Sequence, residues 1–529
     1  MSQAFASAAA EESRQQWLEA HERFGEDLRR RLGRAATPEW AEAVAEEEPL
    51  PLDERLVQAI WNDQLLRADE LRTASGKRLE VIEPGRWNTS RGPDFLGGRV
   101  RILGQDEPGD VEIHIRSADW RNHGHHQDFE YNNVVLHVSL HASDDRPFDE
   151  KQNGARLERL ILEPFLEPDL DTIRRTLNPD DYPYGRPAEE GLCARQFLAL
   201  KETDARAFLR SAGRARIEDK IARFHAQLAS SDPLQLLYQS LMVGQGFKSN
   251  KTLYFLLSKR APLREMMDYA QDVAPHERPD LYLSILLNVA QLIPPGADLL
   301  PETDPETAAL RERLGRHWRL VRGYYADRLL PPTKRWYAGM RPPGFPGRRL
   351  AAMSILLGRL ADPDAPLFEV FANRLERLPL DLDAKGWKAF FAEWTEQLTV
   401  DAPDHYFATH FTIGGKPAKP QALLGEPAAK SNFFNVLLPL AVLKARVERR
   451  RDLEKRAWMA IQTYPALTAN SVTKFMKKRL FAESGRDQAF FRTELMQQAL
   501  FKVFQDCCAH NERTCEDCTF LCPPYRPPG

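Results

Sequence analysis

Two segments in the first third of the chain alternate strictly between apolar and polar residues, which is the pattern of β-strands. In residues 110–116, DVEIHIR, the valine and the isoleucines point to one face, while Glu112 and His114 point to the other. Residues 133–141, NVVLHVSLH, repeat the pattern and place His137 on their polar face. Each segment is therefore predicted to be a strand with one buried face and one face that carries ionisable side chains.

Weaker alternation and helical spacing complete the predicted order of elements. Residues 77–88 and 97–104 indicate further strands. Apolar residues recur at helical spacing over residues 53–66, where Asp53 is placed to cap the helix. The predicted order is helix, strand, strand, strand, short helix, strand, which indicates a small mixed-sheet α/β domain over residues 51–190.

Strand alternation nearly vanishes beyond residue 195, where helical patterns such as residues 204–228 and 433–458 replace it. Proline-rich breaks separate these patterns, and they show no fixed period of a repeat protein. The chain is therefore predicted to follow the α/β domain with a large all-helical region. In order, we predict a polar helical extension, the α/β domain, a helical region that binds substrate, and a cysteine-rich metal-binding segment, at residues 1–50, 51–190, 191–500 and 501–529.

The composition narrows the class of protein. With 529 residues and 43% hydrophobic composition, the chain is long enough to bury more than one core. Its net charge of −3 gives no general attraction to nucleic acid, so any polyanion site has to be local. The N-terminus lacks the pattern of a signal peptide, and no apolar run is long enough to span a bilayer. We therefore expect a cytoplasmic protein with no membrane partner.

Acidic and histidine side chains near the first strands indicate a metal site. Asp94 follows a Gly-Pro pair just before one predicted strand, and Glu112 and His114 share one face of the next. If these strands form an antiparallel hairpin, the three side chains converge, because the start of one strand lies beside the end of the other. Two carboxylates suit Mg²⁺ or Mn²⁺, ions that can activate water for phosphodiester hydrolysis.

The Pro-Asp pair, the Glu-Ile-His triplet and the strand order resemble the PD-(D/E)XK nuclease superfamily. The resemblance implies a mixed-sheet nuclease fold in which Asp94 and Glu112 bind the catalytic metal. The third residue of the motif orients or activates water; it is a lysine in the superfamily and His114 here. Histidine accepts a proton near neutrality, so the exchange is compatible with chemistry. The superfamily often adds an acid from the preceding helix, and Glu54 is the candidate for that accessory role.

Histidines gather in the same part of the chain, and six of the 13 lie between His114 and His141. The candidate accessory residues in this part are His123, His126, Asp128 and His137. The segment HGHHQD is similar to the HxHxDH box of metallo-β-lactamase-type zinc hydrolases, although Gln127 stands where that box has aspartate. Capping of a loop by His123 and Asp128 is the structural alternative.

Five of the six cysteines fall between Cys507 and Cys522. Four of them have the spacing of a metal or cluster site: Cys508, Cys515, Cys518 and Cys522. They predict bound Zn²⁺ or a [4Fe–4S] cluster, because four thiolates within a short segment can enclose one ion or cluster. The spacing is similar to the cluster loop of endonuclease-III-type DNA glycosylases, and some PD-(D/E)XK helicase-nucleases also carry iron–sulfur. Reduced cysteines without a ligand are the alternative.

A stretch between residues 331 and 350, PPTKRWYAGMRPPGFPGRRL, contains basic and aromatic residues and no acid. Cations for phosphates and rings for stacking are what single-stranded nucleic acid requires. The residues predicted to bind nucleic acid are Lys334, Arg335, Trp336, Arg341, Arg348 and Arg349. The alternative is a loop that bridges helices and exposes its charges to water.

Together these features support the hypothesis of a metal-dependent, nuclease-like hydrolase that cleaves phosphodiester bonds of DNA or RNA. Two alternatives stay open: an inactive nucleic-acid-binding protein that keeps the nuclease fold, and an interaction scaffold without enzymatic activity. The whole chain, with HGHHQDFEYNNVVLHV and RPPGFPGRRLA, is also similar to a bacterial family of unknown function. That second resemblance implies no activity.

Overall fold

The structure is a computed structural model that describes most of the chain between residues 52 and 508. The described ranges are residues 52–88, 92–177, 192–228, 231–246, 250–293, 304–337, 340–362, 364–482 and 484–508. The predicted extension at residues 1–50 lies outside these ranges, as do Cys515, Cys518 and Cys522. Cys508 ends the last described helical turn and is half-buried.

The described residues form two compact units. One unit contains a sheet and comprises the described residues up to 194, together with residues 474–482 and 504–508. The other is helical and comprises the described residues of 195–473 and 484–503. A small mixed sheet is thus followed by a large helical region, as the change in periodicity along the chain predicts.

Seven strands of the described residues form one sheet in the order β1-β3-β4-β5-β7-β6, and β2 pairs with β3. Their bounds are β1 (Leu79–Glu83), β2 (Arg86–Trp87), β3 (Phe95–Ile102), β4 (Gln105–Arg116), β5 (Val134–His141), β6 (Phe148–Glu150) and β7 (Arg156–Ile161). β1, β3 and β4 are antiparallel, β4, β5 and β7 are parallel, and β6 is antiparallel to β7. The segments predicted as strands are strands, whereas β6 and β7 were not predicted.

Short helices complete the sheet-containing unit in the predicted order. Helix α2 (Glu54–Asp63) precedes the sheet, and Asp53 caps it by accepting the Leu56 N–H over 2.7 Å. Helix α3 (Asp119–Asn122) and two 3₁₀ turns lie between β4 and β5. The remaining helices with residues in this unit are α4 (Leu170–Thr176), α5 (Leu192–Ala199) and α19 (Ser471–Phe481).

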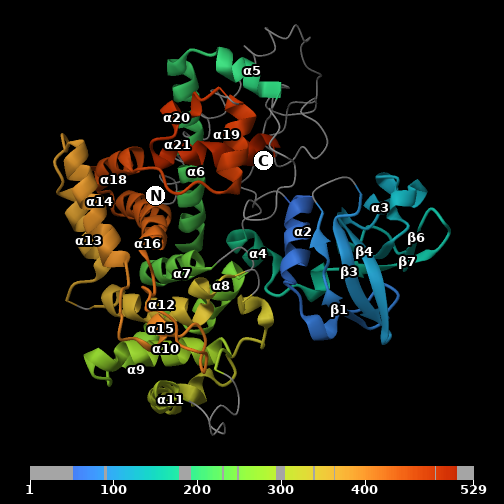
Figure 1. Cartoon of the computed structure of the whole chain (residues 1–529), viewed down its shortest axis with the longest axis horizontal. Helices are drawn as coiled ribbons and strands as arrows, with labels where there is room; N and C mark the ends of the chain where they lie inside the picture. The colour runs from blue at the N-terminus through green and yellow to red at the C-terminus, as the bar shows by residue number, and fades with distance from the viewer. Residues whose placement is uncertain are drawn as a thin grey trace. The chain divides into compact units, whose positions relative to one another are not determined.

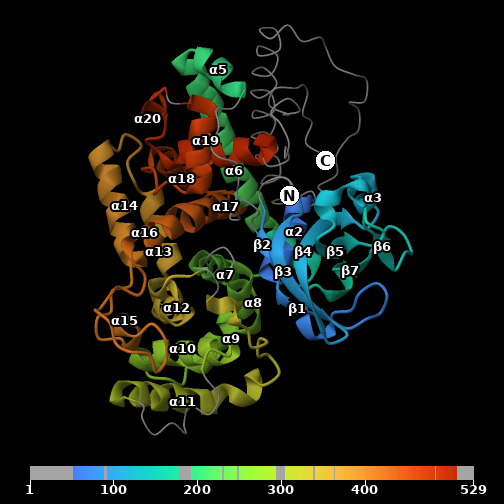
Figure 2. The same cartoon turned by 45° about the vertical axis from the view of Figure 1, so that its right-hand side comes forward.

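The two faces of the sheet differ in chemistry. The apolar face consists of fully buried side chains, among them Val111, Ile113, Leu136, Val138 and Leu160. It packs against α2, whose Trp61 belongs to the same core, and Figures 1 and 2 show α2 beside the sheet. On the opposite face, Trp120, Tyr131, Val134 and Leu157 form a small apolar cluster. The ionisable side chains on that face are therefore enclosed, and enclosed polar groups need partners.

Helices joined by loops build the other unit. Their bounds are α6 (Glu202–Leu228), α7 (Pro233–Gln245), α8 (Lys251–Arg260), α9 (Leu263–Ala270), α10 (Arg278–Val289), α11 (Pro305–Tyr325), α12 (Pro346–Leu360), α13 (Leu367–Glu376), α14 (Ala384–Leu398), α15 (Tyr406–Thr409), α16 (Glu426–Asn432), α17 (Leu438–Glu448), α18 (Arg451–Thr463), α20 (Asp487–Phe490) and α21 (Glu494–Val503). Helix α6 packs against α21. A Cβ atom on Gly213 would lie 2.2 Å from the Leu495 carbonyl oxygen, so this helix pair requires glycine at that position.

The single helical pattern over residues 433–458 is divided in the structure. A π-helical turn, Phe433–Leu437, leads into α17, and α17 ends where Arg449 adopts a left-handed conformation with φ 58°. Arg450 then binds Glu376 of α13 over 2.5 Å, and α18 begins at the next residue. This tertiary ion pair accompanies the break, and the periodicity of the sequence does not reveal it.

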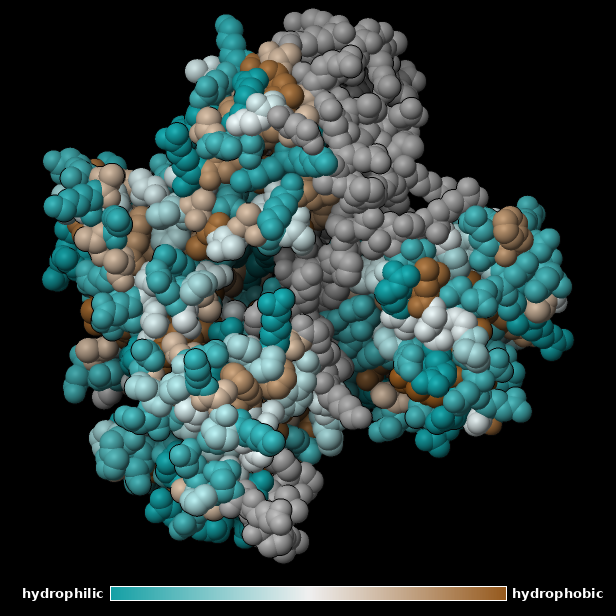
Figure 3. All heavy atoms as spheres, viewed as in Figure 1, coloured by the Kyte–Doolittle hydropathy of each residue, from teal (hydrophilic) through white to brown (hydrophobic). Residues whose placement is uncertain are grey.

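On the face shown in Figure 3, the described residues are mainly hydrophilic, and apolar residues appear as scattered spots. Scattered apolar side chains are normal on a water-exposed surface. Among the described helices, none combines the length and the apolar character needed to cross a lipid bilayer.

Candidate metal centre

The β3–β4 hairpin brings Asp94, Glu112 and His114 together. Its antiparallel register places the residue before β3 beside Glu112. The Asp94 N–H donates to Glu112 Oε2 over 3.0 Å, and the Ile113 N–H donates to Asp94 Oδ2 over 3.0 Å. Glu112 and His114 share one strand face, and Glu112 Oε1 lies 3.7 Å from His114 Nε2. The three residues named from strand alternation and the Pro-Asp pair are therefore neighbours.

His125 joins this group from the segment between β4 and β5. Its Nε2 lies 3.1 Å from Glu112 Oε1 and 3.2 Å from His114 Nε2. Together with the 3.7 Å between Glu112 and His114, these contacts define a triangle of three donor atoms. Glu112, His114 and His125 are 4%, 0% and 5% exposed, so the donor triangle is enclosed by protein.

His123 lies at the exposed side of the donor triangle. One of its ring nitrogens lies within 4.8 Å of ring nitrogens of both His114 and His125, and its side chain is exposed. Its ring meets the His114 ring edge-on, with centroids 4.9 Å apart. Three imidazoles and one carboxylate are thus gathered at one place, and one of the four side chains reaches solvent.

Aromatic residues and one glycine hold the histidine segment in place. The His125 ring packs on Tyr131 with centroids 3.9 Å apart, and Trp120 lies beside it at 5.4 Å. Gly124 has a φ of +77°, a conformation that side-chain-bearing residues rarely adopt. This glycine separates α3 from the following 3₁₀ turn, and the histidines on either side of it, His123 and His125, lie near the same residue, His114.

Behind His114, a chain of buried side chains extends to β6 and β7. His114 Nδ1 lies 2.9 Å from His137 Nε2, and His137 Nδ1 lies 2.7 Å from Asp149 Oδ2. Arg159 donates to both carboxylate oxygens of Asp149, over 2.5 Å and 2.6 Å. The four side chains are at most 1% exposed. Carboxylates that bind histidines in this way commonly orient metal-binding imidazoles.

We call this hydrogen-bonded chain, from Arg159 and Asp149 through His137 to His114, the buried relay. It determines which nitrogen of each histidine carries a proton. The carboxylate of Asp149 only accepts, so His137 donates from Nδ1 and its Nε2 becomes an acceptor. His114 then donates from Nδ1, and its Nε2 presents a lone pair to the donor triangle. That lone pair and Glu112 Oε1 face each other across 3.7 Å, and a cation stabilises such a pair of acceptors.

Burial keeps both relay histidines neutral. The pKa of His114 lies well below 6.5, because the ring is buried and because three other histidines are near it. Burial also lowers the pKa of His137, against the opposing effect of its hydrogen bond to Asp149. Although burial would raise the pKa of Asp149, hydrogen bonds from His137 and Arg159 hold it below its usual value. A neutral imidazole is the form that binds a metal ion.

The donor triangle has the dimensions of a metal shell. Tetrahedral ligands about 2.0–2.1 Å from a zinc ion lie about 3.3 Å from one another. The three distances here are 3.1, 3.2 and 3.7 Å. Imidazole nitrogens with one carboxylate suit zinc and similar transition metals, whereas Mg²⁺ prefers oxygen ligands. The side chains present therefore fit Zn²⁺ better than the Mg²⁺ that the two carboxylates alone suggest.

Other candidate residues have different surroundings. Glu54 is in the first turn of α2. From the same helix, Gln58 Nε2 donates to Asp94 Oδ1 over 2.8 Å. Asp128 accepts a backbone N–H over 2.9 Å and caps a 3₁₀ turn, which is the structural alternative for this residue. His126 is half-buried in the preceding 3₁₀ turn.

Three members of the site were not predicted: His125, Asp149 and Arg159. His125 belongs to the HGHHQD segment, and the three histidines of that segment indicate a candidate metal site. The segment has no periodicity that would predict which of these histidines faces Glu112 and His114. Asp149 and Arg159 reach the relay because β7 pairs with β5 and β6 pairs with β7. Neither pairing has a signal in the local pattern of the sequence.

The stretch predicted to bind nucleic acid is largely built into the helical unit. Trp336 and Arg348 are 1% and 0% exposed. The Arg348 guanidinium donates to the carbonyl oxygens of residues 407, 408, 421 and 422, so its charge is used inside the protein. These two side chains are therefore not part of a nucleic-acid surface in this structure. The others are exposed (Arg341), half-buried (Arg349) or have side chains outside the described residues (Lys334 and Arg335).

Comparison with known proteins places the site within a family. A family model with the description "Protein of unknown function (DUF2851)" matches residues 54–470, which include the sheet, the histidine segment and most of the helical unit. Neither a curated protein nor a solved structure matches the chain. Since the match covers well over half of the sequence, the chain belongs to this family of unknown function, DUF2851.

Proposed function

We propose that the chain is a metal-dependent hydrolase of the nuclease type, with an ion held by Glu112, His114 and His125. The observation that carries the proposal is the buried donor triangle, whose His114 lone pair is oriented by the relay from Asp149. A bound Zn²⁺ or similar ion supplies two effects, polarisation of a phosphodiester and a lower pKa for its water. The substrate class is DNA or RNA.

The order of the elements supports a relation to the PD-(D/E)XK nucleases. Helix α2, the antiparallel strands β1, β3 and β4, the short helix α3 and the parallel strand β5 follow one another along the chain. Asp94 and Glu112 stand at the acidic positions of the motif and are hydrogen-bonded neighbours. His114 stands at the lysine position and faces Glu112. The acidic positions of the motif are therefore present, and histidine side chains stand beside them where the superfamily motif has a lysine.

Access to the ion is proposed from the side of His123. Glu112, His114 and His125 are buried, whereas His123 is exposed and lies beside them. Catalytic zinc sites commonly have three protein ligands and a fourth position for water or substrate. We place this fourth position next to His123, where the imidazole can contact the phosphate or protonate the leaving oxygen.

A structural ion is the second candidate, and the burial of the donor triangle favours it. If His123 becomes the fourth ligand, the shell is closed and the ion stabilises the fold without reaching a substrate. The chain would then match one of the non-catalytic alternatives, an inactive nucleic-acid-binding protein or an interaction scaffold. The two candidates differ in what His123 does.

A cleavage assay tests the proposed function. The full chain is loaded with Zn²⁺, Mn²⁺ or Mg²⁺ and mixed with labelled single-stranded and double-stranded DNA and RNA. We expect cleavage that stops on addition of a chelator and in Glu112→Gln. The matched control is Glu163→Gln, because Glu163 is an exposed carboxylate that also contacts a histidine, His141. If the metal-loaded chain cleaves none of these substrates, the hydrolase proposal is wrong.

One variant distinguishes the catalytic ion from the structural one. In the catalytic arrangement, His123→Ala keeps the ion and lowers the cleavage rate, because the three buried ligands stay in place. In the structural arrangement, the same variant loses a ligand, so metal affinity falls and the sheet-containing unit becomes easier to unfold. Metal content and cleavage are therefore measured on the same preparation.

A further inference from the structure

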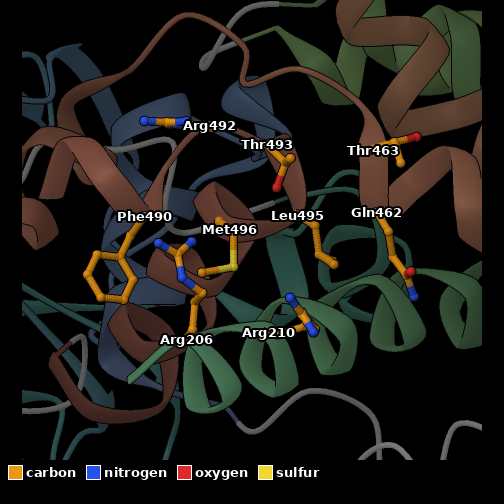
Figure 4. A pocket seen from close by; sticks show the side chains of 9 residues that line it. All are labelled: Arg206, Arg210, Gln462, Thr463, Phe490, Arg492, Thr493, Leu495 and Met496. Carbon is orange, nitrogen blue, oxygen red and sulfur yellow. The ribbon is translucent and has the colours of Figure 1, made fainter. Parts of the chain in front are cut away.

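The helical unit contains a pocket of about 330 Å³ whose chemistry differs from that of the metal centre. Figure 4 shows its lining, which comes from α6, from the end of α18, from the end of α20, from the start of α21 and from the segment between α20 and α21. Three arginines, Arg206, Arg210 and Arg492, line it, and no aspartate or glutamate is among its lining residues. The pocket therefore combines cationic side chains with an apolar floor, by which we mean Phe490, Leu495 and Met496.

Backbone hydrogen bonds hold the walls of this pocket together. The Glu494 N–H donates to the Tyr464 carbonyl oxygen over 2.9 Å, and the Ala466 N–H donates to the Arg492 carbonyl oxygen over 3.1 Å. These bonds join the residues that follow α18 to the start of α21, and α21 packs against α6. Main-chain hydrogen bonds therefore fix the α18 side of the pocket to the α21 side, and α6 closes it by packing against α21.

The floor is apolar and one arginine is already oriented above it. Phe490, Leu495 and Met496 are buried beneath the opening. The Arg206 guanidinium lies over the Phe490 ring at 4.9 Å, and it also binds Glu202 over 2.5 Å. Its charge is thus compensated, and its planar group extends the flat surface of the floor.

Two further arginines supply the uncompensated charge. Arg210 and Arg492 are exposed, and within the described part of the chain neither guanidinium has an acceptor. Guanidinium groups donate paired hydrogen bonds that match the oxygens of a phosphate. Gln462 and Thr463 add uncharged polar groups at the same opening. The pocket therefore offers a net charge of two for an anion, next to a surface for a flat apolar ring.

We propose that this pocket binds a nucleoside phosphate, with the phosphate on Arg210 and Arg492 and the base against the apolar floor. Pockets from about 300 Å³ upward hold ligands of this size. Bases stack on aromatic rings and on guanidinium planes, so the floor made by Phe490 and Arg206 suits them. The ligand comes either as a free nucleotide or as one unit of single-stranded nucleic acid. The site lies in the helical unit and does not depend on the proposed hydrolysis.

The test measures binding to the full chain in the presence of a chelator, so that no cleavage occurs. The probes are short labelled single-stranded DNA and RNA, followed by anisotropy, and adenosine monophosphate, followed by calorimetry. The pocket variant is Arg210→Gln with Arg492→Gln. The matched control removes two exposed arginines of α11 in the same unit, Arg316→Gln with Arg322→Gln, and so changes the net charge equally.

The pocket variant is expected to bind at least about 10-fold more weakly, because each lost contact is a charge-assisted hydrogen bond. The control variant should keep its affinity within about 2-fold, since separated surface charges are screened by salt. Tight binding of adenosine monophosphate alone identifies a free nucleotide, and preference for the oligonucleotides identifies nucleic acid. Equal binding by the two variants, or no binding of any probe to the wild type, overturns the proposal and leaves the metal centre untouched.

Discussion

Replacing His137 with phenylalanine should weaken metal binding at the candidate centre without removing a ligand. His137 Nε2 is the acceptor for His114 Nδ1, at 2.9 Å, and thereby directs the lone pair of His114 Nε2 toward Glu112. Phenylalanine supplies a slightly larger aromatic ring without nitrogen atoms, and this ring can pack beside Trp120, which lies 5.4 Å from the His137 ring. Asp149 keeps its two hydrogen bonds from Arg159, so no carboxylate is left without a partner.

The size of the effect follows from the lost acceptor. A buried N–H of His114 without a partner costs about 1–3 kcal/mol. The ring avoids that cost by moving its proton to Nε2, where it can face Glu112, and this occupies the position of the metal. Removal of such supporting partners typically lowers metal affinity roughly 10- to 100-fold, or about 1.4–2.7 kcal/mol.

The assay is competition for Zn²⁺ between the protein and a chromophoric chelator at fixed pH. The control is His141→Phe, which changes another histidine on the same face of β5, one that is half-buried and contacts Glu163 instead. All variants carry Cys515→Ser and Cys518→Ser, because the C-terminal thiols are a predicted second zinc site. If His137→Phe binds Zn²⁺ as tightly as His141→Phe, the relay does not orient His114 and the reasoning fails.

Three stability measurements probe the helical unit. Gly213→Ala should lower the free energy of unfolding in urea even though alanine favours helix by about 1 kcal/mol, since its Cβ would lie 2.2 Å from the Leu495 carbonyl oxygen; an unchanged value would contradict this contact. Glu218→Gln should lower the free energy of unfolding by about 1.5–3 kcal/mol, because it removes the buried carboxylate that binds Arg446 at 2.6 Å and leaves Arg446 with half-buried Glu454 at 2.8 Å, whereas a cost near zero would show that the pair is replaceable. Burial and nearby arginines lower the pKa of His405 to about 4, so only the unfolded chain is protonated between about pH 4 and 6.5. Stability should therefore fall by up to about 3 kcal/mol as the pH drops through this window, and His405→Gln should abolish that part of the fall; an identical pH dependence in the variant would refute it.

Strand alternation was sufficient to place the acidic part of the site. Glu112 and His114 are two residues apart in a strand, so they necessarily share a face, and a hairpin between consecutive strands is the simplest pairing. These two local facts bring Asp94, Glu112 and His114 together. The change from strand alternation to helical spacing near residue 195 predicted a small sheet before a helical region.

Local sequence patterns could not predict the buried relay. Strand β6 has three residues, too few for a period, and β7 places leucines three residues apart, which mimics a helix. Arg159 therefore enters the site through the pairing of β7 with β5, and Asp149 through the pairing of β6 with β7. The buried role of Arg348 was hidden for another reason, because an arginine that binds carbonyl oxygens and one that binds phosphates look alike in a sequence.

The measurement that tests the central claim most directly is anomalous X-ray diffraction at the zinc edge from crystals of the zinc-loaded full chain. We predict a peak about 2.0–2.2 Å from Glu112 Oε1, His114 Nε2 and His125 Nε2, since these are the bond lengths of zinc to carboxylate and imidazole. Peaks confined to other places, such as the C-terminal thiols, with none at the donor triangle, would contradict the claim that these residues hold a metal ion.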